Sequence, residues 1–259
     1  MSAIKDFFRD HNRGPHVYAH RGAHQTLPEN TLETFEAAMR QGAHGVELDV
    51  RLCASADVVV FHDADLMRMA GRPERVADLG WQDLRKVDLG NGCRVPLLDD
   101  ALDLLHSHDA VVNVELKADG ACSRSLVNAV SRVLQAQSSA SRARIFCSSF
   151  SSLTVALLLK AGQVPVSYLL STKHHPRVRA QLAKMCSSLS GLHPHHSLVT
   201  DADVAIWHKH GWLVNTWTVD ALDDIQAMDR AGVDGIITND VPGTLRALLD
   251  GASQPRGTS

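Results

Sequence analysis

The chain has 259 residues, of which 44% are hydrophobic and 21% are charged, which is the composition of an ordinary globular protein. A length near 250 residues is typical of a single α/β barrel, although it could also hold two small domains. The net charge of −3 with histidine neutral provides no basic surface, so we expect no nucleic-acid partner.

The cysteines and the apolar runs of the chain indicate its cellular compartment. The cysteines form no CxxC pair and are odd in number, which excludes a zinc finger and a disulfide framework. The first residues lack the apolar core of a signal peptide, and no run approaches the roughly 18 apolar residues of a membrane span. We therefore expect a cytoplasmic protein with reduced thiols and no stable membrane insertion.

Short apolar runs alternate with segments of helical periodicity along the chain. The expected strands lie at 16–20, 45–50, 58–62, 111–116, 144–149, 164–170, 211–217 and 234–238, with a weaker one at 189–193. Helical periodicity is clear in "TLETFEAAMRQG" and "SSLTVALLLKAG", which lie between such runs. This alternation predicts a parallel sheet.

The helix after the first run has recognisable ends. Asn30 precedes "TLE", so we expect Asn30 to be the N-cap and Glu33 its capping-box partner. Gly42 follows the last apolar position and can adopt the left-handed conformation that ends a helix. The glycines of "KAGQVP" and "RAGVDG" are expected to end later helices in the same way.

One connection is too short for a parallel crossover. Only "RLCASAD" separates the runs at 45–50 and 58–62, so these two must form an antiparallel hairpin. A symmetric hairpin centred between Ser55 and Ala56 would pair Asp49 with His62. Without the return arm of this hairpin, the remaining runs match the eight strands of a TIM (β/α)8 barrel.

The runs define one domain rather than two. We expect a single barrel over residues 1–250, with residues 63–96 as a small, charged insertion after the second-strand hairpin. Residues 251–259 are small and polar, and we expect them to form a disordered tail.

Polar residues occupy the carboxyl ends of the runs. Glu47 and Asp49 are two residues apart on one strand and therefore share a face, as do Glu115 and Lys117 on another. In a barrel, these ends form the rim on which active sites lie. Buried carboxylates need a partner, and three carboxylates without cysteine favour Mg²⁺ or Ca²⁺ over zinc.

Two histidines lie beside these carboxylates. His20 ends the first run, and His62 ends the return arm of the hairpin. Neighbouring strands are about 4.8 Å apart, so the histidines, the carboxylates and Lys117 can converge on one small ligand. A cation with Arg21 and Lys117 suits a phosphate, and two histidines can act as general base and general acid near neutral pH.

At these residues the sequence resembles the glycerophosphodiester phosphodiesterase family. The resemblance extends from about residue 16 to residue 248, and its motifs match in order and spacing. The motifs are "AHRG" (19–22), "PENT" (28–31), "GVELDV" (45–50), "VVFHD" (59–63), "NVELK" (113–117), "NTWTVD" (215–220) and "GIITNDVP" (235–242).

The resemblance implies a barrel that uses bound Mg²⁺ or Ca²⁺ to hydrolyse small-molecule glycerophosphodiesters to glycerol 3-phosphate and an alcohol. By position it implies an acid/base pair of His20 and His62, metal ligands Glu47, Asp49 and Glu115, phosphate contacts Arg21 and Lys117, and a glycerol-site wall, Trp217. The sequence departs from the family after His62, where "HDADLMRMAG" lacks the usual threonine but keeps Leu66 and Arg68.

Several alternatives stay open. The barrel could be a lysophospholipase D-type phosphodiesterase that acts on lipids, or a catalytically silent barrel that binds a phosphorylated ligand. Arg21 and Lys117 could be structural ion-pair partners, and Trp217 could serve only in packing. Asn239 could touch the site or merely form a turn. The scattered histidine-rich segments are expected at the surface rather than in a second metal site, and the oligomeric state is not determined by the sequence.

Overall fold

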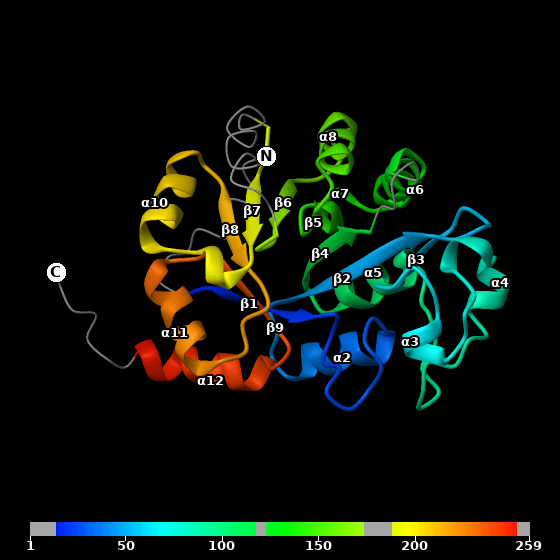
Figure 1. Ribbon diagram of the computed structural model, residues 1–259, viewed down its shortest axis with the longest axis horizontal. Coiled ribbons are helices and arrows are strands. Elements are labelled where there is room, and N and C mark those ends of the chain that lie inside the picture. Colours follow the sequence, from blue (N-terminus) through cyan, green and yellow to red (C-terminus); the bar gives the residue numbers. More distant parts are fainter. Residues whose placement is uncertain (1–13, 118–122, 174–187, 253–259) are drawn as a thin grey trace.

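The computed structural model describes residues 14–117, 123–173 and 188–252. Within these ranges eight parallel strands form a closed barrel with helices around it (Figure 1). The strands follow the order β1-β9-β8-β7-β6-β5-β4-β2, and pairing of β1 with β2 closes the ring. The predicted (β/α)8 barrel is confirmed.

The barrel strands correspond to the predicted apolar runs. They are β1 (His16–His20), β2 (Gly45–Leu52), β4 (Val111–Leu116), β5 (Ile145–Ser149), β6 (Val166–Leu170), β7 (Gly191–Pro194), β8 (Leu213–Thr216) and β9 (Gly235–Thr238). β3 (Val58–Val60) lies outside the ring and pairs antiparallel with the end of β2. The weak run near residue 190 is therefore a full barrel strand, β7.

Helices cover the outside of the barrel. The longer ones are α2 (Leu32–Arg40), α5 (Leu98–Ser107), α6 (Ser123–Ala136), α8 (Ser152–Ala161), α10 (Asp201–Lys209), α11 (Leu222–Ala231) and α12 (Val241–Ala252). The short ones are α3 (Met67–Ala70), α4 (Trp81–Leu84), α7 (Ser139–Arg142), and the 3-10 turns η1 (Val76–Asp78) and η3 (His196–Leu198). Left-handed glycines follow α8 and α11, as predicted.

Helix α2 begins differently from the prediction. Its N-cap is Thr31, whose hydroxyl accepts a hydrogen bond from the amide of Thr34, and Thr34 completes the capping box in place of Glu33. Asn30 has a left-handed backbone with φ 59°, a conformation that asparagine tolerates better than most residues. The prediction of Asn30 as the cap is therefore wrong, and its side chain is free to turn toward β2.

The β2–β3 hairpin differs from the prediction by one residue. Val50 pairs with Val60, and the amide of Phe61 donates to the carbonyl of Asp49 at 2.9 Å, so Asp49 is not paired with His62. The cause is an asymmetric loop in which Ala56 has φ 64°. A three-residue loop that ends in a left-handed residue is a common hairpin connection, usually with glycine at that position. The expected symmetric register is therefore wrong.

Residues 63–96 pack on the hairpin rather than on the barrel core. They contain α3, η1 and α4, which lie beside β3 at the right of Figure 1. A separate apolar cluster holds them there, consisting of Cys53, Val59, Phe61, Leu66, Val76, Leu84, Val87, Leu89 and Val95.

Tyr18 on β1 fills the interior of the barrel. It is fully buried among apolar residues of four other strands: Val111, Phe146, Leu213 and Ile237. Glycines on its two neighbouring strands make room for the ring, because a Cβ on Gly45 or Gly235 would lie 3.0 or 2.7 Å from it. This apolar plug leaves the carboxyl ends of the strands as the place for polar groups.

Over the ranges described, no helix combines the length and the apolar character needed to cross a bilayer. Residues 251 and 252 are the last of α12, and the rest of the predicted tail lies outside the described residues.

Candidate active site

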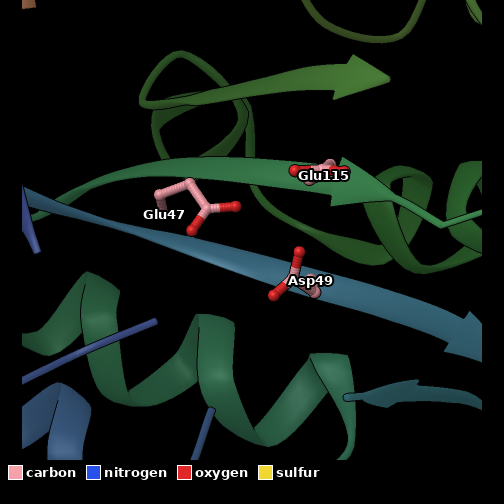
Figure 2. A group of neighbouring side chains, drawn as sticks. All are labelled: Glu47, Asp49 and Glu115. Carbon is pink, nitrogen blue, oxygen red and sulfur yellow. The ribbon is translucent and has the colours of Figure 1, made fainter. Parts of the chain in front are cut away.

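Three buried carboxylates meet at the rim of the barrel. Glu47 and Asp49 lie on β2 and Glu115 lies on the neighbouring strand β4, directly opposite Asp49 (Figure 2). One oxygen from each carboxylate lies within 4.8 Å of the others. Glu47 Oε2 is buried and has no hydrogen-bond donor among the described residues. Such an acidic cluster is costly unless a cation neutralises it.

The charges of the cluster divide unequally. Burial, together with Asp49 and Glu115, raises the pKa of Glu47 well above its usual value. Burial also raises the pKa of Glu115 to about 7, against the opposing effect of Lys117. At Asp49 the positive charges of Lys117 and Arg21 outweigh burial and lower the pKa to about 2. The protein's own cations therefore satisfy one carboxylate fully and leave the other two short of positive charge.

Two cationic side chains flank the carboxylates. Lys117 Nζ lies 3.0 Å from Asp49 Oδ1 and also contacts Glu115. Arg21 Nε lies 3.2 Å from Asp49 Oδ2, and its other end reaches Glu29 at 2.9 Å. Arg21 has a left-handed backbone with φ 57°, and its amide donates to the carbonyl of Glu47 at 2.8 Å.

Asn30, which precedes the N-cap of α2, supports Asp49. Its side-chain amide donates to Asp49 Oδ2 at 2.9 Å, and its carbonyl oxygen accepts from the Asp49 amide at 3.3 Å. Two-sided bonding of this kind fixes the carboxylate in one rotamer.

His20 lies at the end of β1 with both ring nitrogens near polar groups. Its Nδ1 is 2.8 Å from Oδ1 of Asn239, and its Nε2 is 4.0 Å from Glu47 Oε2. Burial, and next the charge of Arg21, lowers the pKa of His20 to about 4.

His62 follows β3 and has a charged partner. Its Nδ1 lies 2.7 Å from Asp63 Oδ1. Burial lowers the pKa of His62, while Asp49 and Asp63 oppose that shift. Asp63 is in turn held by Arg68, whose Nε donates to Asp63 Oδ2 at 2.6 Å.

Arg68 connects the insertion to the loop between β1 and α2, which carries Glu29. Besides Asp63, its guanidinium binds both oxygens of Glu29, at 2.6 and 3.2 Å. Glu29 also accepts from Arg21 at 2.9 Å. One arginine on α3 therefore stabilises the partner of His62 and the partner of Arg21 together.

A cavity of about 250 Å³ opens beside these groups. Its charged and polar lining residues are His20, Arg21, Glu47, His62, Asn113, Glu115, Lys117 and Thr218, and its apolar ones are Phe150, Leu169, Trp217 and Ile237. The Trp217 indole donates to the His193 carbonyl at 2.8 Å and stands edge-on to the ring of Phe150 at 5.3 Å. The cavity thus combines charged groups with an apolar lining.

The structure brings the predicted site residues together. All except Asp49 line the cavity, and Asp49 lies within ion-pair distance of Arg21 and Lys117. Asn239, for which the sequence left two roles open, contacts His20. Sequence reasoning missed Glu29, Asn30, Asp63, Arg68 and Asp220; the only signal for Glu29 and Asn30 was their place in "PENT".

The histidine-rich segments add no second cluster within the described ranges. The carboxylate group is the one set of potential metal ligands found there. His208 binds the buried Asp234 at 2.8 Å and His195 bonds to Ser197, which are structural roles. The two histidines of the "KHHP" segment, His174 and His175, lie outside the described residues.

Comparison with known proteins identifies the family of the chain. The profile of the glycerophosphoryl diester phosphodiesterase family matches residues 20–242. A glycerophosphodiester phosphodiesterase of Caldanaerobacter subterraneus subsp. tengcongensis is 31% identical over 246 residues, covering 90% of this chain and 97% of its own.

Solved structures share the fold. A putative glycerophosphoryl diester phosphodiesterase from Silicibacter pomeroyi DSS-3 superposes with a TM-score of 0.86 at 27% identity, covering 96% of this chain and 97% of its own. A phosphodiesterase of Oleispira antarctica, in complex with its product sn-glycerol-3-phosphate, superposes with a TM-score of 0.80 at 23% identity, covering 92% and 97%.

This chain is an enzyme of the phosphoric diester hydrolase class. It is a (β/α)8 barrel with histidines, carboxylates and cations on its rim. The chain belongs to the glycerophosphoryl diester phosphodiesterase family.

Proposed function

We propose that the cavity hydrolyses glycerophosphodiesters to glycerol 3-phosphate and an alcohol, with one divalent metal ion and two histidines. The observation that carries this proposal is the meeting of the carboxylate cluster, two cations and both histidines around one small cavity. The Oleispira neighbour, which carries sn-glycerol-3-phosphate, supports the identity of the product.

The metal site consists of Glu47, Asp49 and Glu115. These are hard oxygen donors, and Glu47 Oε2 is a buried acceptor with no donor among the described residues, so the set fits Mg²⁺ or Ca²⁺. When bound, such an ion neutralises phosphodiester charge and orients the attacking oxygen.

Arg21 and Lys117 bind the phosphate. Both line the cavity and both are ion-paired to Asp49, which holds their charges at the rim. Trp217 and Phe150, whose ring lies 5.8 Å from Lys117 Nζ, supply an apolar wall against which the glycerol carbons of the substrate pack.

His20 and His62 are the acid/base pair. Each has its Nδ1 bound to a neighbouring side chain, which leaves Nε2 as the nitrogen available to a ligand in the cavity. One ring removes the proton from the attacking oxygen, and the other protonates the leaving alkoxide.

We propose the cytoplasm as the compartment, because three of the cysteines, Cys53, Cys93 and Cys147, are free thiols in the described part of the chain.

The test is a coupled assay for release of glycerol 3-phosphate over a panel of glycerophosphodiesters. A lysophospholipid in the same panel tests the lipid alternative. Release from the soluble diesters, lost on chelation, is the expected result. A protein that binds these diesters without hydrolysing any of them would contradict the proposal.

A further inference from the structure

The side chain of Asn239 lies between His20 and the carboxylate of Asp220. Asn239 Oδ1 is 2.8 Å from His20 Nδ1, and Asn239 Nδ2 is 2.7 Å from Asp220 Oδ2. Asp220 follows β8, Asn239 follows β9 and His20 ends β1, and these strands are neighbours in the barrel. The three residues therefore form a chain of hydrogen bonds across three adjacent strand ends.

The orientation of the Asn239 amide is determined by Asp220. An ionised carboxylate only accepts hydrogen bonds, so the NH₂ group of Asn239 must face it. The carbonyl oxygen of Asn239 must then face the imidazoles of His20 and His24, the latter at 3.0 Å. Asp220 is itself fixed, because its Oδ1 accepts from the Asn239 backbone amide at 2.7 Å and from the Thr238 hydroxyl at 3.0 Å.

This orientation selects one tautomer of His20. An amide oxygen cannot donate, so His20 must carry a hydrogen on Nδ1 to bond to it. In the neutral ring the lone pair then lies on Nε2, the nitrogen nearer to Glu47 and the cavity.

We propose that Asp220 and Asn239 are positioning residues that hold His20 in the tautomer with its Nε2 lone pair toward the substrate. The inference rests on the proposed acid/base role of His20. Neither residue lines the cavity, so both act through His20 rather than on the substrate.

Replacing Asp220 by asparagine should invert the chain of hydrogen bonds. The two donors on Oδ1 keep an oxygen at that position, so the new NH₂ group replaces Oδ2 and meets the NH₂ group of Asn239. Asn239 then has to flip and present its NH₂ group to His20. His20 Nδ1 then accepts a hydrogen bond and carries the lone pair. Nε2 carries the hydrogen and can no longer accept a proton.

The experiment compares wild type, Asp220→Asn, and Asp223→Asn, an exposed acid in the first turn of α11 that serves as the control. Nitrogen-15 spectra of labelled histidine report the tautomer of His20, with its signals assigned from a His20→Asn variant. We expect Asp220→Asn to show Nε2–H and to lower kcat roughly 10²–10⁴-fold, the range of general acid–base catalysis, with KM within about twofold of wild type. The control should match wild type in both measurements.

A second variant covers poor folding of Asp220→Asn. Asn239→Leu removes the amide while leaving the Asn239 backbone amide and Thr238 on Asp220, and it should give a mixture of His20 tautomers and a smaller, roughly tenfold or greater, loss of kcat.

A tautomer switch without loss of kcat, or a loss of kcat with the Nδ1–H tautomer intact, would overturn the positioning role. Failure of the underlying function has a different signature: His20→Ala would then keep wild-type rates. If His20→Ala is inactive while Asp220→Asn keeps both the Nδ1–H tautomer and wild-type kcat, only the positioning proposal fails.

Discussion

The two sides of the rim hold their histidines by different means. On the β1 side, His20 is bonded to a neutral amide, Asn239, which the barrel strands themselves supply. On the hairpin side, His62 is bonded to a carboxylate, Asp63, which an arginine of the insertion holds in place. Both rings use Nδ1 for these bonds and line the same cavity.

The difference affects how readily each imidazole is protonated. A carboxylate on Nδ1 stabilises the protonated imidazole more strongly than a neutral amide oxygen does. Within the proposed mechanism we therefore expect His62 to be the ring that is protonated and donates to the leaving group, and His20 to be the neutral ring that accepts a proton. The direct partners also differ in origin, so changes in the insertion should alter the hydrogen bond of His62 and leave the hydrogen bond between His20 and Asn239 in place.

The largest effect should come from removing the proposed metal ion, which both sides of the rim share. Chelation with EDTA should abolish activity, and Mg²⁺ or Ca²⁺ should restore it, because the carboxylate cluster between the histidines needs a cation. Glu47→Gln should weaken the metal by removing one anionic ligand. Isothermal titration with each metal, together with the glycerol 3-phosphate assay, measures both. Full activity in a metal-free sample would refute the metal site.

Alanine at either histidine should separate the two sides. We expect each replacement to lower kcat/KM by about 10²–10⁴ on a natural diester. A nitrophenyl phosphodiester needs no proton on its leaving group, so it should rescue His62→Ala and not His20→Ala. Equal residual rates of both variants on both substrates would contradict the division of labour.

Arg68→Gln should weaken the support of His62 directly and the contacts of His20 not at all. It removes the bonds to Asp63 and Glu29 while leaving the contacts of His20 unchanged, so we expect a roughly tenfold lower kcat. Arg72→Gln is the matched control, since Arg72 lies in the same insertion and its ion pair is with Glu74, outside the cavity. Similar kinetics for the two variants would show that the Arg68 contacts do not reach the reaction.

Trp217→Ala should weaken substrate binding and leave the acid/base step of the two histidines largely unchanged. Loss of the wall beside Phe150 should raise KM several-fold with kcat largely kept, because uniform binding is removed. Comparing the kinetics with the melting temperature distinguishes this from packing. A lower melting temperature with unchanged KM would assign Trp217 to structure.

The smallest effect on activity is expected for a third histidine, whose titration should change the stability of the fold instead. His193 is fully buried between Asn113 and Asn215, and burial lowers its pKa to about 3. The unfolded chain takes up a proton near pH 6.5 while the folded one does not, so stability should fall as the pH falls from 6.5 toward 3. Between pH 6.5 and 5 this loss is about 2 kcal/mol. His20, whose pKa is also lowered, contributes a similar loss to both proteins, so denaturant unfolding should show a steeper fall in wild type than in His193→Gln; parallel pH profiles would contradict it.

The fold and the polar strand ends could be predicted from local patterns. Alternation places Glu47 with Asp49, and Glu115 with Lys117, on the faces that the structure shows, because the two-residue period of a strand leaves no choice. The hairpin register could not be predicted, since Ala56 adopts a left-handed turn conformation that its sequence does not advertise. The cap was ambiguous for a similar reason: Asn30 and Thr31 are both good N-caps, and only the tertiary bond to Asp49 decides between them.

The supporting contacts of the histidines lay beyond sequence reasoning. Arg68 and Glu29 are 39 residues apart, and Asn239 and His20 are 219 apart. No periodicity links such pairs, because their meeting depends on loop paths and on ring closure of the barrel. Asp63 was visible beside His62, but its role depends on Arg68 turning back from α3.

The segment between β1 and α2 begins and ends with a non-glycine residue in the left-handed conformation, Arg21 and Asn30, and the amide of Asn30 donates to the carbonyl of Arg21 at 2.9 Å. Each such conformation costs roughly 1–2 kcal/mol, and the closed loop is already ordered before any ligand arrives. The conformational entropy of fixing the arginine is therefore lost during folding rather than during association. Substrate meets a preorganised receptor, so the affinity of this rim for a phosphodiester is not reduced by the ordering of that loop.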